Sequence, residues 1–185
     1  MILYINSCVR EDSRTDRLAK VLLEKLGEYV EVKLDELNLY PLNKESLEYR
    51  TRLIESGDYE NAIFDYAKQF SKAETIVIAA PYWDGSYPAA LKIYLENIYV
   101  TGIVTKYGKD GRPEGLCSAK KLYYVTTAGG PYNPGYSYEY IKDLAVNMFG
   151  ITDTELIYVE NLDIEGNDAE KLLQNGIASI ENKFK

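Results

Sequence analysis

The chain of 185 residues carries 21 Lys and Arg against 29 Asp and Glu, giving a formal net charge of −8. This acidic balance disfavours nucleic acids and anionic membranes as partners, because both attract clustered cations. The absence of histidine excludes Ser-His-Asp and Cys-His hydrolases, HExxH metalloproteases and His-ligated zinc or haem, so no metal site is expected. Any chemistry must therefore use carboxylates, Lys, Tyr, Cys, backbone dipoles or a bound cofactor.

Length and cysteine usage indicate one globular domain in a reducing compartment. We expect a single domain over residues 1–185, since domains usually have about 100–200 residues. Cys8 and Cys117 form no CxxC motif, which argues against a zinc knuckle or a disulfide framework. The apolar start at 1–5 is too short for a signal peptide, and the apolar run at 76–83 is far below the ~20 residues that cross a bilayer. We expect a cytoplasmic protein without a membrane segment.

The first half of the chain predicts strands and helices in alternation. Ser13 and Asp16 form a variant of the capping box at the start of a helix, and Gly27 is a stop signal at its end. The expected elements are a buried strand at Ile2–Asn6, a helix between Ser13 and Gly27, a strand at Tyr29–Leu34, and one or two helices within Leu47–Ser71, broken near Ser56–Asp58.

The second half continues the alternation. The run TIVIAA at Thr75–Ala80 is typical of a central parallel strand that is covered on both faces. The later expected elements are a loop at Pro81–Tyr87, a helix at Ala89–Tyr99 with Pro88 in its first turn, a turn-rich stretch at Gly102–Gly115, a strand at Lys121–Thr127, a helix at Tyr138–Phe149, a strand at Thr154–Val159 and a helix at Asp168–Asn182. This order predicts an α/β three-layer sandwich around a parallel sheet.

Ligands of open parallel sheets bind beyond the carboxyl ends of the strands, and three loops leave such ends here. In the first loop, the hydroxyls of Ser7, Ser13 and Thr15, together with free N–H groups and the helix dipole, form a candidate phosphate cradle. The loop matches neither GxxxxGK[ST] nor GxGxxG, which disfavours an NTPase P-loop and a Rossmann site. The alternative is a capped helix start, because helix caps use the same residue types.

The other two loops also combine ligand signals with simpler explanations. Tyr82, Trp83 and Tyr87 follow the central strand and suit a planar heterocycle, although such rings also cap cores. Gly129 and Gly130 can turn their N–H groups toward an anion, although a tight turn also uses two glycines. The convergence of all three loops on one edge of the sheet is more informative than any one loop.

Five segments in order carry a resemblance to a known family. They are S-x5-S-R-T from Ser7, PYWDGSYPAALK from Pro81, KYGKDGRPEGL from Lys106, TTAGG from Thr126 and FGITD from Phe149. Together they resemble the flavodoxin-like NAD(P)H:quinone oxidoreductase and FMN-dependent azoreductase family. The resemblance implies a flavodoxin-like fold with a five-stranded parallel sheet in the order 2-1-3-4-5. It also implies a homodimer with FMN, less so FAD, at the interface, and two-electron ping-pong hydride transfer from NADH or NADPH to a small-molecule quinone or azo acceptor.

The resemblance also assigns roles to residues of this sequence. It implies a phosphate and ribityl loop at Ser7, Ser13, Arg14 and Thr15, a stretch beside the isoalloxazine at Pro81, Tyr82, Trp83, Asp84 and Gly85, a loop at the pyrimidine edge at Thr127, Ala128, Gly129 and Gly130, and a substrate-stacking Tyr107. The N–H groups of Gly129 and Gly130 would stabilise the reduced ring. Tyr132 or Tyr136 would supply half of the Tyr-His pair of mammalian-type quinone reductases, and Asp84-Gly85 replaces the Asn-Phe that is usual in azoreductases.

Three alternatives come from other classes of protein. A one-electron flavodoxin-type carrier is the nearest competitor, and a flavin-free binding domain is the second. A phosphoacceptor domain needs an Asp at the end of the third strand, where this chain has Ala79-Ala80-Pro81, so that class is excluded. Arg14 itself has two roles open to it, since it can pair with a phosphate or lie along the first helix toward Asp16 or solvent.

Overall fold

Five parallel strands form the centre of the protein in a computed structural model that describes all residues 1–185. The strands are β1 (Ile2–Asn6), β2 (Tyr29–Lys33), β3 (Thr75–Ala79), β6 (Lys121–Thr127) and β7 (Asp153–Val159). Their order across the sheet is β2-β1-β3-β6-β7, which is 2-1-3-4-5 when only these five are counted. The predicted flavodoxin-like sheet is confirmed.

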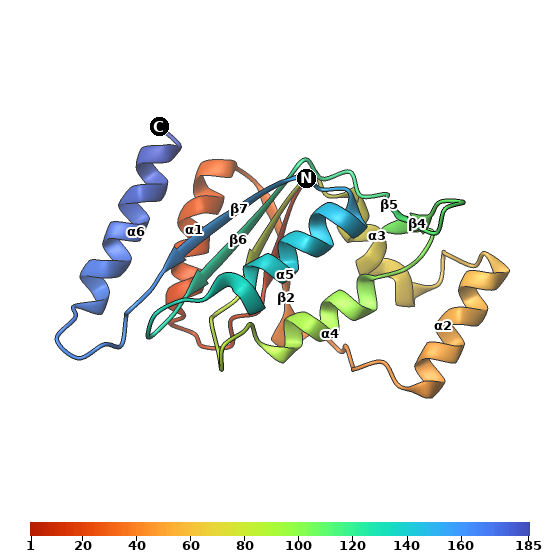
Figure 1. The fold of residues 1–185 in the computed structure, drawn as a ribbon, viewed down its shortest axis with the longest axis horizontal. Coiled ribbons are helices and arrows are strands. Elements are labelled where there is room, and N and C mark those ends of the chain that lie inside the picture. The colour runs from red at the N-terminus through yellow and green to blue at the C-terminus, as the bar shows by residue number, and fades with distance from the viewer.

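Helices cover both faces of this sheet (Figure 1). On one face lie α1 (Arg14–Leu26) and α6 (Ala169–Lys183), and on the other lie α3 (Asp65–Lys72), α4 (Ala89–Ile98) and α5 (Tyr138–Asp143). At the margin, α2 (Lys44–Ser56) has no buried residue. Three short 3-10 turns complete the layers, namely η1 (Leu34–Glu36), η2 (Ala62–Phe64) and η3 (Pro134–Tyr136). No helix is both long and apolar enough to cross a membrane.

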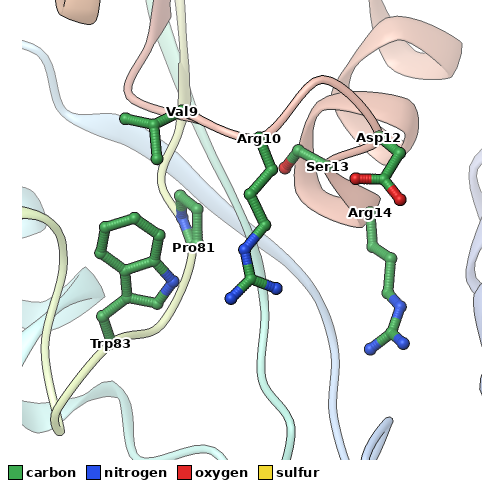
Figure 2. A pocket seen from close by; sticks show the side chains of 7 residues that line it. All are labelled: Val9, Arg10, Asp12, Ser13, Arg14, Pro81 and Trp83. Atoms are coloured by element: carbon green, nitrogen blue, oxygen red, sulfur yellow. The ribbon is translucent and has the colours of Figure 1, made fainter.

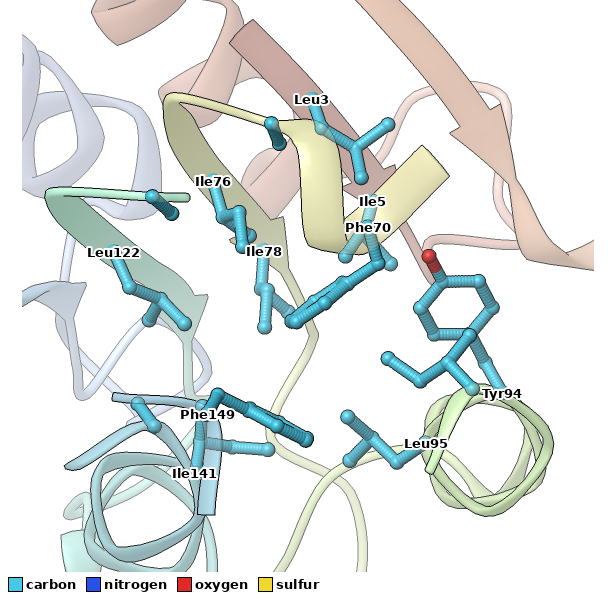
Figure 3. Packing of buried hydrophobic residues seen from close by; sticks show 14 of the residues in the cluster. Leu3, Ile5, Phe70, Ile76, Ile78, Tyr94, Leu95, Leu122, Ile141 and Phe149 are labelled. Atoms are coloured by element: carbon cyan, nitrogen blue, oxygen red, sulfur yellow. The ribbon is translucent and has the colours of Figure 1, made fainter. Parts of the chain in front are cut away.

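Alternation along the strands divides the buried side chains into two cores. In β3, Ile76 and Ile78 face the helices α3, α4 and α5, whereas Val77 and Ala79 face α1 and α6. Figure 3 shows the larger core, in which the Phe70 and Phe149 rings pack edge to face with centroids 5.1 Å apart. Because both faces of β3 are covered, its sequence is apolar after Thr75, as predicted for a central parallel strand.

The helix ends follow the predicted signals. Ser13 caps α1 by accepting a hydrogen bond from the N–H of Asp16, and Gly27 ends the helix. The reciprocal half of the predicted capping box does not form, because the Asp16 carboxylate accepts from Tyr4 and Asn6 instead. Gly57 ends α2 in the left-handed conformation, with φ of 72°, as the predicted break required. These signals are local, so the sequence alone places them correctly.

Two segments differ from the sequence predictions. The stretch at Gly102–Gly115 contains an antiparallel hairpin of β4 (Thr105–Tyr107) and β5 (Pro113–Gly115), whose strands are too short to show an alternating pattern. The single helix predicted at Tyr138–Phe149 changes after α5 into a π-helix, η4 (Leu144–Phe149). A hydrophobic period measured over six residues does not distinguish α from π winding.

The edge-to-face pair of Phe70 and Phe149 supports the larger core. We expect Phe70→Ala to lower the free energy of unfolding by about 3–5 kcal/mol, because it removes a fully buried ring and leaves a cavity. Urea unfolding followed by circular dichroism measures this change. The matched control is Tyr40→Ala, a position that is 69% exposed, where the change should stay within about 0.5 kcal/mol. Equal effects of the two variants would contradict this account of the core.

Candidate active site

Four loops meet at the carboxyl edge of the sheet, one more than the sequence predicts. The segments that follow β1, β3 and β6 are joined there by the segment at 160–168, which connects β7 to α6. Hydrogen bonds tie this fourth loop to the Gly129–Gly130 segment, and an ion pair ties it to the start of α1. The site is therefore built from loops that are far apart in the sequence.

The loop after β1 presents backbone donors at the start of α1. The N–H groups of Arg14 and Thr15 have no hydrogen-bond partner within the chain. The hydroxyl of Ser13 caps the helix, and the hydroxyl of Ser7 donates to the carbonyl of Ala79 over 3.0 Å. The Thr15 hydroxyl lies 2.6 Å from that of Thr127. The free donors at this helix start are thus mainly backbone groups, which together with the helix dipole favour an anion.

A cavity of about 130 Å³ opens beside this helix start (Figure 2). It is lined by Val9, Arg10, Asp12, Ser13, Arg14, Pro81 and Trp83. Whole drug-sized ligands occupy pockets of roughly 300–1,000 Å³, so this cavity suits one end of a larger ligand. It joins the first predicted loop to Pro81 and Trp83 of the second.

Two arginines line this cavity, and only one of them is paired with a carboxylate. The guanidinium of Arg14 is ion-paired with Asp163 at 2.7 Å, so its partner is neither Asp16 nor solvent alone. The guanidinium of Arg10 has no carboxylate partner and extends between Trp83 and Arg14 (Figure 2). Sequence reasoning missed Arg10. Glu11 and Asp12 follow it directly, so the loop between β1 and α1 has no net positive charge that could have pointed to it.

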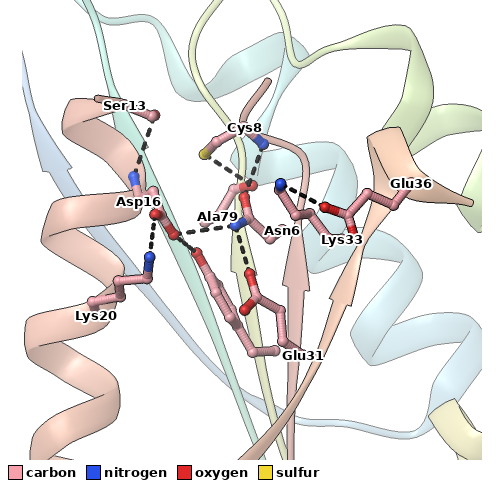
Figure 4. A network of polar contacts seen from close by, with 10 residues as sticks. Asn6, Cys8, Ser13, Asp16, Lys20, Glu31, Lys33, Glu36 and Ala79 are labelled. Carbon is pink, nitrogen blue, oxygen red and sulfur yellow. Dashed lines mark hydrogen bonds and ion pairs between the residues drawn. The ribbon is translucent and has the colours of Figure 1, made fainter. Parts of the chain in front are cut away.

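A polar network behind the cavity holds the first loop in place (Figure 4). The Asn6 amide donates to Asp16 over 3.1 Å and to Glu31 over 2.8 Å, and Asn6 accepts from the N–H of Cys8. Burial raises the pKa of the Cys8 thiol to about 12, so it stays protonated at neutral pH. The site therefore contains no activated thiolate, and its cysteine has a structural role.

The loop after β3 contains a tight turn at Asp84-Gly85. Trp83 and Ser86 exchange two backbone hydrogen bonds of 2.8 Å, and the two central residues have positive φ, 48° for Asp84 and 82° for Gly85. This pattern is typical of a type I′ turn, for which Asp-Gly is a favoured sequence. The departure from Asn-Phe thus has a local structural consequence. The Trp83 ring beside the turn is 37% exposed.

The loop after β6 presents two unpaired donors. The N–H groups of Gly129 and Gly130 make no hydrogen bond within the chain, whereas their carbonyls accept from the N–H groups of Asp163 and Asn161. A Cβ at Gly129 would meet the Asp163 carboxylate at 2.5 Å, so packing explains this glycine. A Cβ at Gly130 would meet nothing within 4 Å. Gly130 therefore leaves open space where the ligand is predicted to contact the protein backbone.

Tyr132 lies close to this loop, with its hydroxyl directed inward. The hydroxyl is 2.8 Å from that of the buried Ser137, and the Tyr132 ring packs edge to face on Tyr82 with centroids 5.0 Å apart. Burial raises the pKa of Tyr132, which keeps the phenol protonated at neutral pH. Tyr136 is 73% exposed and contributes its carbonyl to Ser86 instead.

Tyr107 is the one predicted site residue that lies apart from the others. Its hydroxyl is 3.3 Å from that of Tyr99, directly after the end of α4. The loop with Trp83 lies before the start of α4, and this helix of 10 residues is about 15 Å long. Within one chain, Tyr107 is therefore separated from the four-loop site by roughly the length of α4.

Comparison with known proteins defines the family. A family model described as flavodoxin-like fold matches residues 1–184. The chain is 34% identical over 200 residues to an FMN-dependent NADH:quinone oxidoreductase of Clostridium acetobutylicum, covering 100% of this chain and 98% of that protein. A protein of the same description from Coprothermobacter proteolyticus is 32% identical over 197 residues, with coverage of 100% and 98%. The chain belongs to the flavodoxin-like family that includes these oxidoreductases, as the sequence motifs predicted.

Solved structures support the same fold. An azoreductase from Bacillus anthracis superposes with a TM-score of 0.85 at 20% identity, covering 99% of this chain and 97% of that one. An FMN-dependent NADH-azoreductase of the same species, in complex with FMN, gives a TM-score of 0.81 at 23% identity, with coverage of 99% and 96%. At this level of identity the likeness concerns the fold.

Proposed function

We propose that the protein is a flavin-dependent NAD(P)H oxidoreductase that reduces quinones or azo compounds, with FMN as cofactor. The observation that carries the proposal is the set of unpaired backbone N–H groups, at Arg14 and Thr15 on one side and at Gly129 and Gly130 on the other, around one sheet edge. These donors suit a ligand with a phosphate at one end and a group that can take up negative charge at the other. The named relatives, which span the whole chain, are FMN-dependent NADH:quinone oxidoreductases, and this favours NADH as the donor.

The residues around the edge fit the two ends of FMN. The phosphate would lie at the start of α1, held by the N–H groups of Arg14 and Thr15, the hydroxyl of Ser13 and a guanidinium. The predicted donor Ser7 is not free for this role, because its buried hydroxyl already donates to the Ala79 carbonyl. The ring would lie against Pro81–Gly85 and against Thr127–Gly130, where Gly130 leaves space for close backbone approach. The FMN-dependent relatives favour FMN over FAD as the cofactor.

When bound, the flavin supplies the hydride-transfer chemistry, which no side chain of this protein can perform. The chain's own part is to bind, orient and stabilise charge. The N–H dipoles of Gly129 and Gly130 point at the site without a competing partner and favour negative charge there. Tyr132 would assist in handling charge at the same edge, and burial keeps its phenol protonated. The type I′ turn at Asp84-Gly85 holds the Trp83 ring beside the opening.

A one-electron carrier is the competing function, and the relatives named as oxidoreductases argue against it. The two are separated by reconstitution with FMN followed by NADH oxidation with a quinone as the sole acceptor. We expect steady, flavin-dependent turnover with parallel lines in double-reciprocal plots, as a ping-pong mechanism requires. Protein that binds FMN but does not oxidise NADH would contradict the enzyme assignment. Protein that stays colourless would contradict the whole proposal.

The unpaired Arg10 should contribute more to FMN affinity than the paired Arg14. We expect Arg10→Ala to weaken FMN binding by about 10- to 100-fold, since a charge-assisted hydrogen bond contributes about 1.5–3 kcal/mol. Arg14→Ala removes a guanidinium already engaged with Asp163 and should weaken binding less than about fivefold. Fluorescence titration of the apo protein with FMN measures both constants. The reverse order would show that Arg14 leaves Asp163 to bind the phosphate.

We further propose a homodimer that places Tyr107 of one chain at the site of the other. Tyr107 lies too far from its own site, next to a groove of about 330 Å³ between α4, α5 and η4. Leu95, Tyr99, Leu144 and Met148 give this groove an apolar lining, and α2 beside it buries none of its residues. A second copy is the occupant that would both cover this face and bring Tyr107 to a flavin.

We also propose a cytoplasmic location, which the free cysteines support, and a single domain over residues 1–185.

The proposed dimer can be tested by its mass and by substitutions in the groove. Light scattering should give twice the 21.1 kDa of one chain. Leu144→Lys, within the groove, should shift the protein toward the monomer, because it buries an unpaired charge. Val30→Lys on the edge strand β2, where Val30 is 43% exposed, is the control and should leave the mass unchanged. A monomeric wild type with full activity would contradict the shared site.

A further inference from the structure

The fourth loop lies directly behind the Gly129–Gly130 donors, and residues near its start are hydrogen-bonded to the carbonyls of the glycine loop. We infer that its first four residues, Glu160–Asp163, here called the backing segment, form the positioning element of those donors, with Glu160 as the positioning side chain. This inference rests on the proposed function, because it assigns a role toward the same flavin. Neither the motifs nor the composition of the sequence pointed to this segment.

Three backbone hydrogen bonds join the backing segment to the glycine loop. The N–H groups of Leu162, Asp163 and Asn161 donate to the carbonyls of Ala128, Gly129 and Gly130 over 3.2, 2.8 and 3.0 Å. In a trans peptide the C=O and the N–H point in opposite directions. The bond to the Ala128 carbonyl therefore turns the N–H of Gly129 away from the segment, and the bond to the Gly129 carbonyl does the same for Gly130. The backing segment thus directs both free donors toward the proposed ligand.

Glu160 holds the far end of the glycine loop. Its carboxylate accepts a hydrogen bond of 2.7 Å from the N–H of Tyr132, the first backbone donor after Gly130, because Pro131 has none. A bond to a carboxylate is stronger than one between neutral groups. It fixes the chain directly after the two glycines, where conformational freedom would otherwise be greatest. The Tyr132 N–H is thereby engaged, so within residues 128–132 only Gly129 and Gly130 keep free donors.

Asn161 allows the backing segment to adopt its shape. It has φ of 63°, one of only two non-glycine residues with positive φ. Asparagine tolerates this left-handed conformation better than most residues. Its carbonyl accepts from the Asn167 side chain over 2.8 Å, and its N–H donates to Gly130, so both of its backbone groups are engaged. A local backbone strain is therefore maintained at a point that contacts the predicted donor loop.

The expected consequence concerns the charge state of the flavin. Preorganised N–H donors stabilise negative charge more than they stabilise a neutral ring. If the backing segment orients these donors, its loss should weaken the binding of reduced FMN more than that of oxidised FMN. A purely structural role would lower stability without this selective effect.

The test compares Glu160→Ala, Glu160→Gln and Glu165→Ala by the midpoint potential of bound FMN. Glu160→Ala should reduce the preference for reduced flavin by about tenfold, which corresponds to a potential about 30 mV more negative for two electrons. Glu160→Gln keeps an oxygen acceptor for the Tyr132 N–H and should recover most of this change. Removal of a negative charge alone acts in the opposite direction, toward a more positive potential. Glu165→Ala is the matched control, an exposed carboxylate in the same loop.

A second readout needs no flavin. In the apo protein, amide hydrogen exchange of residues 128–132 should be at least tenfold faster in Glu160→Ala than in Glu160→Gln or Glu165→Ala, with similar melting temperatures for all three. Unchanged potential and exchange in Glu160→Ala, in a wild type that binds FMN normally, would overturn the positioning role. A wild type that binds no FMN, with the exchange difference present, would instead contradict the proposed function alone.

Discussion

The parallel hydrogen bonding of β1 to β3 and of β3 to β6 is the constraint on which the site depends. In-register pairing, such as Asn6 with Ala79 and Ala79 with Val125, brings the carboxyl ends of the three strands to one edge, where β6 continues slightly further to Thr127. The loops that follow must then share one edge of the sheet, although they are about 70 and 50 residues apart. Backbone donors that no strand or helix uses are concentrated at that edge. A change in strand register would disperse them and remove the site.

This acidic protein must bind an anionic ligand through groups that lie close to the ligand. With a net charge of −8, the protein as a whole repels phosphate, so affinity must come from groups within a few ångströms. Unpaired N–H groups at Arg14, Thr15, Gly129 and Gly130 supply partial positive charges there. The ion pair of Arg14 with Asp163 connects the first loop to the fourth and leaves Arg10 as the cation without a carboxylate partner. Asp163 thus determines which of the two arginines is free to bind a phosphate.

Local signals in the sequence predicted much of the fold and part of the candidate site. The cap at Ser13, the stop at Gly57 and the apolar run of β3 each depend on neighbours along the chain, and each was predicted correctly. The β4–β5 hairpin and the π winding of η4 were not, because short strands and short helical segments carry no periodic signal. The site prediction included both glycines but not Arg10, Glu160 or Asp163.

The sequence by itself determined the fold class, the family and the absence of any histidine-based mechanism, because these follow from composition, local periodicity and ordered motifs. Only the tertiary structure decided how the site residues are used. It paired Arg14 with Asp163, turned the Tyr132 hydroxyl toward Ser137, and separated Tyr107 from its own site by the length of α4. It also brought the backing segment behind Gly129 and Gly130. Each of these depends on contacts between residues distant in the chain, for which one sequence contains no local signal.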